Sequence, residues 1–300
     1  MGGYCIIVMK KVLLTGGSGF IGRNIKEHLS EICELYVPER SELNLLDEKA
    51  VREYIKRNKI QIVIHGANPN PVKNPIDNVS TMFEDSMRVF MNLYNAREHY
   101  EYMYTLGSGA EYDKSSDIVL AEESDKRTIP YDGYGLAKYI MNELVKKCDR
   151  MCNLRLFACY GPTDHYSKFI THAIRCCIYG EDITIRQNCY YDYMHVSDLA
   201  NILEYFIYHI PKYHEYNVCS GERHSLKEIA EIVRRQMKAN NVIVLLKNGL
   251  NNEYTGSNKR LLDEIGLYQF VTLEEGIERQ IIAEKEYCKN SNAYYERYSK

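Results

Sequence analysis

Short apolar runs alternate with amphipathic stretches along the first half of the chain. Lys11–Thr15 is an apolar run, and apolar residues recur at helical spacing through Arg23–Ile32. Apolar runs follow at Glu34–Val37, Gln61–Ala67 and Tyr102–Leu106, and one long helical pattern covers Val79–Tyr100. Strands that alternate with helices are typical of an α/β fold built on a doubly wound parallel sheet.

The second half of the chain carries one more predicted strand and two capped helices. Asn153–Phe157 is the strand, and Leu199–Tyr208 is a helix for which Asp198 is the expected N-cap. A capping-box pattern at Ser225 and Glu228 predicts the start of the second helix.

Length, charge and hydropathy exclude several classes of protein. Three hundred residues are enough for a sizeable core. The formal net charge is −3 and the basic residues are dispersed, so neither nucleic acid nor a membrane surface is expected as a partner. No apolar run approaches the roughly 20 residues of a membrane span, and residues 1–8 lack the basic start of a signal peptide. We therefore expect a cytoplasmic protein.

The ten cysteines are scattered along the chain, several of them in apolar segments. In an intracellular protein this distribution favours buried, reduced thiols over disulfides. Cys148 and Cys152 lie close together, as do Cys176 and Cys177, but neither pair has histidines at zinc-type spacing. No metal site is expected.

A glycine-rich turn directly follows the first predicted strand. The motif GGSGFIG at Gly16–Gly22 lies between the strand at Lys11–Thr15 and the helix after it. Glycines allow the backbone to turn tightly and to approach a pyrophosphate, whose charge then lies at the N-terminus of the helix. The strand–turn–helix context therefore predicts a dinucleotide site.

The residues after the second strand bear on the choice of dinucleotide. Glu39 can accept hydrogen bonds from the adenosine ribose of NAD, whereas Arg40 and Ser41 suit the 2′-phosphate of NADP. We favour NADP and keep NAD as the alternative. Asp47 opens the next helix, where it either accepts a hydrogen bond from the adenine amino group or caps the helix.

Six short motifs occur in one order over nearly the whole chain. They are TGGSGFIG at Thr15–Gly22, LGSGAEY at Leu106–Tyr112, YGLAK at Tyr134–Lys138, CYGP at Cys159–Pro162, YDYMHVSD at Tyr191–Asp198 and a closing segment over 258–281. In this combination the chain resembles the extended short-chain dehydrogenase/reductases of the epimerase/dehydratase type, in particular those that modify nucleotide-linked sugars.

The resemblance implies a Rossmann domain over residues 1–160, to which 183–209 returns, and a smaller mixed α/β lobe for a nucleotide-diphosphate sugar over 161–182 and 210–300. It also implies a homodimer, formed through the helices around Val79–Tyr100 and Tyr134–Lys147. Contacts to the cofactor are then expected from Gly16, Ser18, Gly19, Phe20, Ile21, Gly22, Arg40, Leu46, Asp47, Ala67, Tyr134 and Lys138.

Tyr134 and Lys138 lie four residues apart and so share one face of a predicted helix. By the resemblance they form a catalytic set with Ser108. A phenol is a poor acid–base group at neutral pH, and an adjacent ammonium brings its pKa toward the working range. Ser108 is expected to hydrogen-bond the reacting oxygen, and Lys138 is also expected to reach the nicotinamide ribose.

The residues after Ser108 differ from those of two related reaction types. Sugar 4,6-dehydratases carry an Asp-Glu pair where this chain has Gly109 and Ala110, and Glu111 is expected to point elsewhere. Epimerase-reductases resembling GDP-fucose synthase carry a cysteine in place of Ala110 and a histidine in place of Lys168. Dehydration and epimerisation at C3 and C5 are therefore not expected, whereas keto-sugar reduction and C4 epimerisation need only the Ser-Tyr-Lys set and the cofactor.

The contacts to the substrate diphosphate are also altered. The family commonly has an asparagine and an arginine where this chain has Ala158 and Tyr191. His165 and His172 lie near the expected histidine position and leave that alignment open. Candidate substrate contacts are Ser108, Gly109, Lys168, Arg186 and Arg260.

These observations favour an NADPH-dependent, stereospecific reductase of the 4-keto group of a nucleotide-linked sugar, with GDP as one candidate carrier, in carbohydrate biosynthesis. The alternative is an NAD-dependent nucleotide-sugar 4-epimerase, in which Glu39 rather than Arg40 holds the ribose. A third and weaker hypothesis is a non-catalytic dinucleotide-binding sensor. Such proteins tend to lose the Tyr-Lys pair that this chain keeps.

Overall fold

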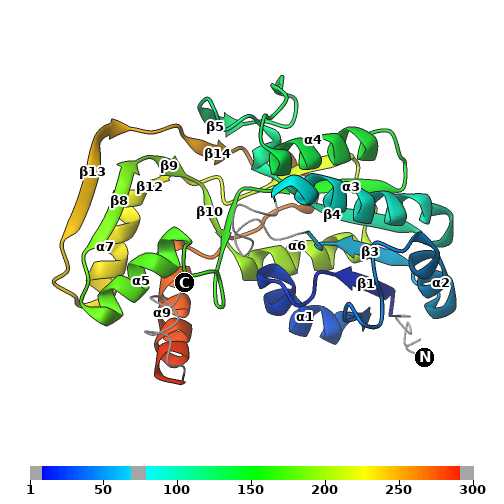
Figure 1. Cartoon of the computed structure of the whole chain (residues 1–300), viewed down its shortest axis with the longest axis horizontal. Helices are drawn as coiled ribbons and strands as arrows, with labels where there is room; N and C mark the ends of the chain where they lie inside the picture. The colour runs from blue at the N-terminus through cyan, green and yellow to red at the C-terminus, as the bar shows by residue number, and fades with distance from the viewer. Residues whose placement is uncertain (1–8, 69–78, 291–300) are drawn as a thin grey trace, which may run out of the picture. The chain divides into compact units, whose positions relative to one another are not determined.

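The computed structural model describes residues 9–68 and 79–290, and it divides into two units (Figure 1). The N-terminal residues 1–8, for which a signal peptide was not expected, lie outside the described residues. The first unit comprises residues 1–108, 131–155 and 200–216, and the second comprises 109–130, 156–199 and 217–300. The lobe boundaries expected from the resemblance remain a prediction.

A six-stranded sheet forms the centre of the first unit, in the order β11-β6-β4-β3-β1-β2. β1 pairs in parallel with β2 and β3, and β3 pairs in parallel with β4. Most of these strands are buried along their whole length, which explains their continuous apolar runs. The strands are β1 (Lys11–Thr15), β2 (Glu34–Tyr36), β3 (Ile62–His65), β4 (Tyr102–Ser108), β6 (Met151–Leu156) and β11 (Glu215–Val218).

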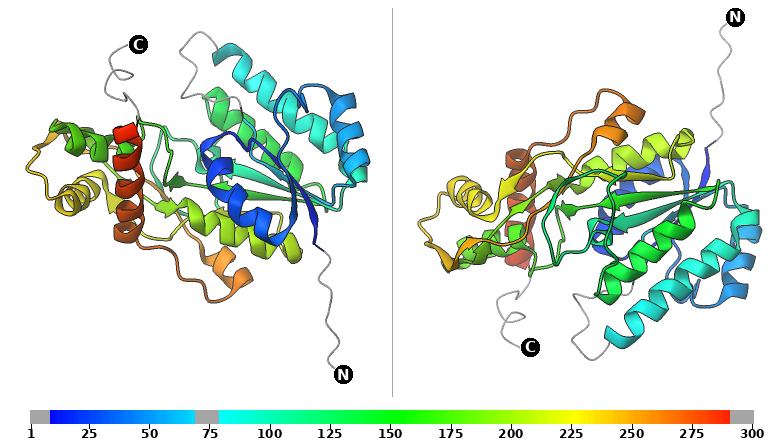
Figure 2. Two further views of the ribbon diagram at one scale, coloured as in Figure 1. Left: turned by 90° about the horizontal axis from the view of Figure 1, so that it is seen from below. Right: turned by 90° about the horizontal axis from the view of Figure 1, so that it is seen from above.

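Helices cover both faces of this sheet, as the views in Figure 2 show. α3 and α4 lie over one face and α1 and α6 over the other (Figure 1). The core under α3 and α4 includes Leu13, Val63, Phe90, Met103 and Met141. The helices are α1 (Phe20–Ile32), α2 (Glu48–Asn58), α3 (Val79–Asn95), α4 (Gly133–Val145) and α6 (Val196–Tyr208). The predicted doubly wound α/β fold is confirmed.

Two predicted details of the helices were wrong. α3 ends at Asn95 rather than Tyr100, because the backbone bonds change there to the i→i−3 type (Ala96 N–H to the Leu93 carbonyl, 3.1 Å) and the chain turns through η2 (Arg97–His99). Asp198 does not cap α6, because that helix already begins at Val196. The Asp198 carboxylate instead accepts a hydrogen bond from the Tyr268 hydroxyl at 2.8 Å.

The second unit contains a four-stranded sheet in the order β12-β9-β14-β5 and two two-stranded parallel sheets, β7 with β10 and β8 with β13. These strands are β5 (Ile118–Ala121), β7 (Ala158–Tyr160), β8 (Ile183–Asn188), β9 (Tyr190–Tyr191), β10 (Tyr193–His195), β12 (His224–Ser225), β13 (Ile243–Leu250) and β14 (Tyr254–Gly256). Its helices are α5 (Phe169–Tyr179), α7 (Leu226–Met237), α8 (Lys259–Ile265) and α9 (Leu273–Asn290).

The core of the second unit is shared by α5, α7, α9 and β8. Ile174, Ile185, Val233 and Ile277 are fully or almost fully buried there. The predicted capping box is confirmed, since the side chain of Ser225 and that of Glu228 each bond the backbone of the other residue. Within residues 9–68 and 79–290, no helix is long and apolar enough to cross a membrane.

A buried ion pair joins two neighbouring strands of the first unit. Arg155 on β6 is fully buried and donates through Nη2 to the carboxylate of Glu215 on β11. Asn142 on α4 donates to the same carboxylate oxygen at 2.6 Å. A buried guanidinium is tolerated because it is paired and hydrogen-bonded. This network therefore fastens the β11 edge of the sheet to the helix layer.

Glu215→Gln should destabilise the protein strongly, because it removes a negative charge that pairs with the fully buried Arg155 guanidinium. Removal of one partner of a buried pair costs about 3–5 kcal/mol. Urea denaturation would measure the free energy of unfolding. The control is Glu53→Gln, which breaks the exposed Lys49–Glu53 pair of α2 and should cost less than about 0.5 kcal/mol. Equal small costs for both variants would contradict the prediction.

Candidate functional site

The turn between β1 and α1 requires glycine at several positions. Gly16 has φ +78°, and a Cβ on it would lie 2.7 Å from the backbone nitrogen of Ala67. A Cβ on Gly17 would lie 2.0 Å from Cγ1 of Val37, and one on Gly22 would lie 2.4 Å from the Gly16 carbonyl oxygen. Side chains at these positions would displace the backbone or the neighbouring strand ends. The motif therefore has a strict steric basis within the first unit.

The N-terminus of α1 fits the diphosphate of a dinucleotide. Gly19 is the N-cap and has no side chain that could bond the first backbone N–H groups of the helix. The first turn contains no acidic residue, and Ser18 and Gly19 are exposed. Backbone N–H groups and the helix dipole both favour an anion at such a helix end. The residues present thus suit the cofactor that the sequence predicts.

A row of polar side chains crosses the sheet just before this turn. Thr15, His65 and Thr105 are in register on β1, β3 and β4. Thr15 Oγ1 lies 3.0 Å from His65 Nδ1 and accepts from the backbone N–H of Ala67 at 3.2 Å. Thr105 Oγ1 donates to Oδ1 of Asn153 at 2.9 Å. Sequence reasoning missed this row, although polar residues within apolar strands were the available signal.

The expected adenosine end of the site lies after β2. Arg40 and Glu39 are exposed in the turn, and the Glu39 backbone N–H donates to the Glu42 carboxylate at 2.9 Å. Asp47 is the N-cap of α2, because its carboxylate accepts from the Ala50 N–H at 3.0 Å. Of the two alternatives for Asp47, the structure supports the capping role.

Tyr134 and Lys138 lie in the first turns of α4, which begins after the N-cap Asp132. Lys138 Nζ donates to the backbone carbonyl of Leu106 at 2.7 Å and lies 6.0 Å from the centre of the Tyr134 ring. Leu106 belongs to β4, which ends at Ser108. Lys138 and Ser108 are 6% and 7% exposed, so both are shielded from solvent. The structure brings Lys138 to Tyr134 and to the strand that carries Ser108.

The residues after Ser108 form the short helix η3 (Gly109–Glu111). Ala110 is buried and has no polar side-chain atom. Glu111 is also fully buried, and its carboxylate forms an ion pair with Nη1 of Arg127 at 3.0 Å. That carboxylate is engaged by Arg127 within the second unit, and the expectation that it points away from the reaction remains a prediction.

The candidate phosphate contacts come from different elements of the second unit. Lys168 is exposed just before α5, and Arg186 is exposed on β8. Arg260, at the start of α8, lies 3.5 Å from the carboxylate of Glu123. His172, one of the two nearby histidines, contacts Sγ of Cys176 one helical turn further on. The substrate roles of these residues remain predictions.

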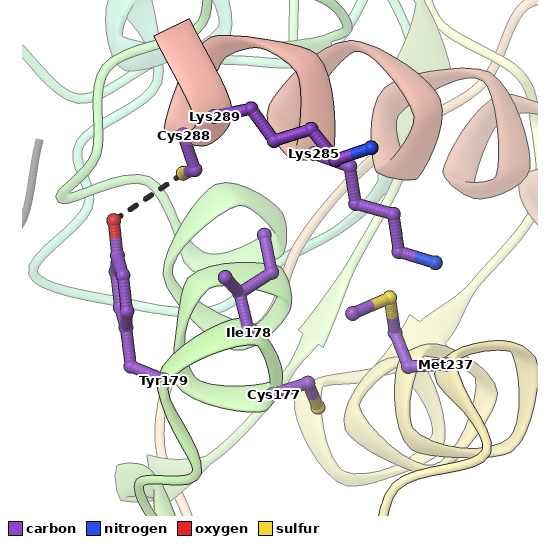
Figure 3. A pocket seen from close by; sticks show the side chains of 7 residues that line it. All are labelled: Cys177, Ile178, Tyr179, Met237, Lys285, Cys288 and Lys289. Atoms are coloured by element: carbon purple, nitrogen blue, oxygen red, sulfur yellow. Dashed lines mark hydrogen bonds between the residues drawn. The ribbon is translucent and has the colours of Figure 1, made fainter. Parts of the chain in front are cut away.

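A hollow of about 420 Å³ lies among α5, α7 and α9 and contains none of the predicted site residues (Figure 3). Ile178, Met237 and Cys177 line it, with Lys285 and Lys289 at α9. The Tyr179 hydroxyl donates to Sγ of Cys288 at 3.3 Å on another side. Within the described residues, no group of three or more metal-ligating side chains gathers.

A family model described as the NAD dependent epimerase/dehydratase family matches residues 12–219. The chain belongs to this family and is an NAD(P)-dependent enzyme of the extended short-chain dehydrogenase/reductase type.

Relatives with known names match nearly the whole chain. A GDP-L-colitose synthase from Yersinia pseudotuberculosis is 26% identical over 90% of this chain and 96% of its own length. A GDP-mannoheptose C4 reductase from Campylobacter jejuni with NADP bound has a TM-score of 0.78 and 17% identity, covering 93% of this chain and 99% of its own. The Bordetella bronchiseptica enzyme WbmG, in complex with NAD and UDP, has a TM-score of 0.81 and 19% identity, covering 93% and 96%. Both structures share the fold.

The histidine in the polar row should leave a mark on the pH dependence of stability. Burial, and to a lesser degree the charge of Lys138, lowers the pKa of His65 from 6.5 to about 3. Between these values the unfolded chain binds a proton that the folded protein does not. Stability is therefore lost as the pH falls from 6.5 toward 3, by about 2 kcal/mol at pH 5.

The substitution His65→Asn keeps a polar atom near Thr15 but removes the imidazole that takes up the proton. Urea denaturation of the wild type and of His65→Asn between pH 7.5 and 5 would measure the difference. Burial also raises the pKa of Asp164 and of Asp192 to about 6, which acts in the opposite sense in both proteins. The wild type should therefore lose more stability on acidification than His65→Asn. An equal loss of unfolding free energy in the two proteins would contradict the lowered pKa of His65.

Proposed function

We propose that this protein is an NADPH-dependent reductase of the 4-keto group of a nucleotide-linked sugar. The observation that carries the proposal is the chemistry directly after Ser108. Gly109 and Ala110 offer no proton-transferring group, and the carboxylate of Glu111 is buried against Arg127. Dehydration and C3/C5 epimerisation need a further acid–base group besides Tyr134, whereas the transfer of one hydride and one proton needs only the Ser-Tyr-Lys set and the cofactor.

The side chains of the first unit suit that transfer. The cofactor, when bound, supplies the hydride to the carbonyl carbon. Ser108 hydrogen-bonds the carbonyl oxygen, and Tyr134 gives its phenolic proton to that oxygen as negative charge develops there. Lys138 is held near Tyr134 by the Leu106 carbonyl, so its ammonium stabilises the phenolate that remains. Proton uptake from solvent then restores the phenol.

The relatives support the substrate class. The GDP-L-colitose synthase and the GDP-mannoheptose C4 reductase carry names that refer to GDP-linked sugars, and the second name refers to reduction at C4. A GDP-linked 4-keto sugar is therefore the first substrate to test. The homodimer implied by the resemblance is part of the same proposal.

The proposal is tested by offering NADPH, and separately NADH, with a panel of enzymatically prepared nucleotide-linked 4-keto sugars. Oxidation of the cofactor, followed at its absorbance band, is expected with at least one sugar. Tyr134→Phe should lower kcat by about 10²–10⁴-fold while cofactor binding is unchanged, because it removes only the proton donor. Tyr139→Phe, five residues further along α4 and on a different face of the helix, should retain activity. No oxidation with any sugar would refute the reductase function.

The choice of cofactor is a separate part of the proposal. Arg40 is exposed in the turn after β2, where a guanidinium can bind the 2′-phosphate of NADP. Glu39 is exposed beside it and would hold the ribose of NAD in the alternative function, a nucleotide-sugar 4-epimerase. An epimerase keeps its NAD through the cycle, so nucleotide released by denaturing the purified protein distinguishes the two functions.

Arg40→Ala should raise the KM for NADPH by about 10–100-fold, because a charge-assisted hydrogen bond to the phosphate contributes about 1.5–3 kcal/mol. The KM for NADH should change little. Steady-state kinetics with both cofactors measure the effect, and Arg52→Ala on the exposed side of α2 is the matched control. An unchanged KM for NADPH, together with NAD released from the denatured protein, would favour the epimerase.

A further inference from the structure

The hollow among α5, α7 and α9 is lined by two cationic side chains and, within the described residues, by no acidic one (Figure 3). Lys285 and Lys289 of α9 supply the two ammonium groups. The carboxylate of Glu284, beside Lys285 in the chain, is buried and engaged by Nε of Arg175 at 2.7 Å. The volume of about 420 Å³ is in the range of small-molecule sites, about 300–1,000 Å³. Because ammonium groups attract carboxylates, the hollow suits a small organic anion.

A thiol lies in the wall of the same hollow. Cys288 is partly exposed, and its Sγ accepts a hydrogen bond from the Tyr179 hydroxyl at 3.3 Å (Figure 3). The guanidinium of Arg175 lies within electrostatic range of Cys288. A hydroxyl donor and neighbouring cations stabilise the negative charge that a sulfur nucleophile carries. The hollow therefore combines groups that bind an anion with a thiol that can react with it.

The other thiols in residues 9–68 and 79–290 are less favourably placed. Nine cysteines are free there, and only Cys159, Cys177 and Cys288 are partly exposed. Burial raises the pKa of Cys159, and it raises the pKa of Cys177 to about 11. Because the thiolate is the nucleophile, such a pKa leaves Cys177 almost unreactive at neutral pH. Cys177 lines the same hollow as Cys288 and so provides an internal comparison.

We propose that this hollow is a modification site, in which a small anionic disulfide of the glutathione class binds and thiolates Cys288. The ammonium groups of Lys285 and Lys289 bind the carboxylates of the disulfide. Sγ of Cys288, as the thiolate, attacks one sulfur of the small molecule, so that a new S–S bond forms and the old one breaks. The leaving thiolate takes up a proton and departs as a thiol. The protein sulfur is thereby oxidised and the small disulfide reduced. This site belongs to the second unit and is independent of the reductase function.

Incubation of the reduced, full-length protein with glutathione disulfide tests this site. Peptide mass spectrometry, after alkylation of the remaining thiols, should find a glutathionyl group on Cys288 and none on Cys177. Cys288→Ser should remove this adduct, whereas Cys177→Ser, a change in the same hollow, should leave it in place. No adduct on Cys288, or equal rates of reaction at Cys177 and Cys288, would overturn the proposal.

A second comparison separates attraction by charge from the reactivity of the thiol. The rates of modification of Cys288 are measured with glutathione disulfide and with the uncharged 2-hydroxyethyl disulfide. Lys285→Gln combined with Lys289→Gln should slow the first reaction about three- to tenfold at low ionic strength and change the second less than about twofold. The control combines Lys227→Gln with Lys259→Gln, two exposed lysines outside the hollow, and should leave both rates unchanged. Equal effects of the first pair on both disulfides would overturn the recognition of an anion.

Discussion

The hydrogen bond from Lys138 Nζ to the Leu106 carbonyl is the contact on which the rest of the candidate site depends. A buried ammonium is costly unless it is hydrogen-bonded, and this 2.7 Å contact gives it a backbone partner whose position the parallel sheet determines. Because Tyr134 lies one helical turn before Lys138, the same bond sets where the phenol lies along β4. Ser108 is two residues beyond Leu106 on that strand. This contact thus ties the helix that carries Tyr134 and Lys138 to the strand that carries Ser108.

The predicted α/β fold and the glycine turn followed from local rules that the sequence displays. Gly16, Gly17 and Gly22 are needed by atoms a few residues away or on the adjoining strand ends, so the motif and its strand–turn–helix context carry almost the whole constraint. The capping box at Ser225 is local in the same way, since its two bonds close within four residues. Such features are predictable because the interacting groups lie close together in the chain.

The features that sequence reasoning missed or misjudged depend on distant partners. Asp198 has the residue type of an N-cap, but its carboxylate bonds Tyr268, a residue far along the chain. The pair of Arg155 with Glu215 and the packing of Tyr254 against Gly109 join segments that no local pattern connects. Sequence reasoning identified Gly109 as a departure from dehydratases, but it could not supply the reason. The reason is steric, because a phenol from another strand already fills that space.

The polar row of the sheet affects the charge balance around Lys138. Burial, and to a lesser degree the charge of Lys138, lowers the pKa of the His65 imidazole, so His65 is neutral at working pH. A second positive charge in this buried region would repel Lys138 and weaken its hold on the Leu106 carbonyl. A neutral His65 avoids that repulsion and still bonds Thr15, whose hydroxyl accepts from the strand end beside the glycine turn. A neutral His65 beside the expected cofactor turn is therefore compatible with the charge of Lys138, the cation proposed to lower the pKa of Tyr134.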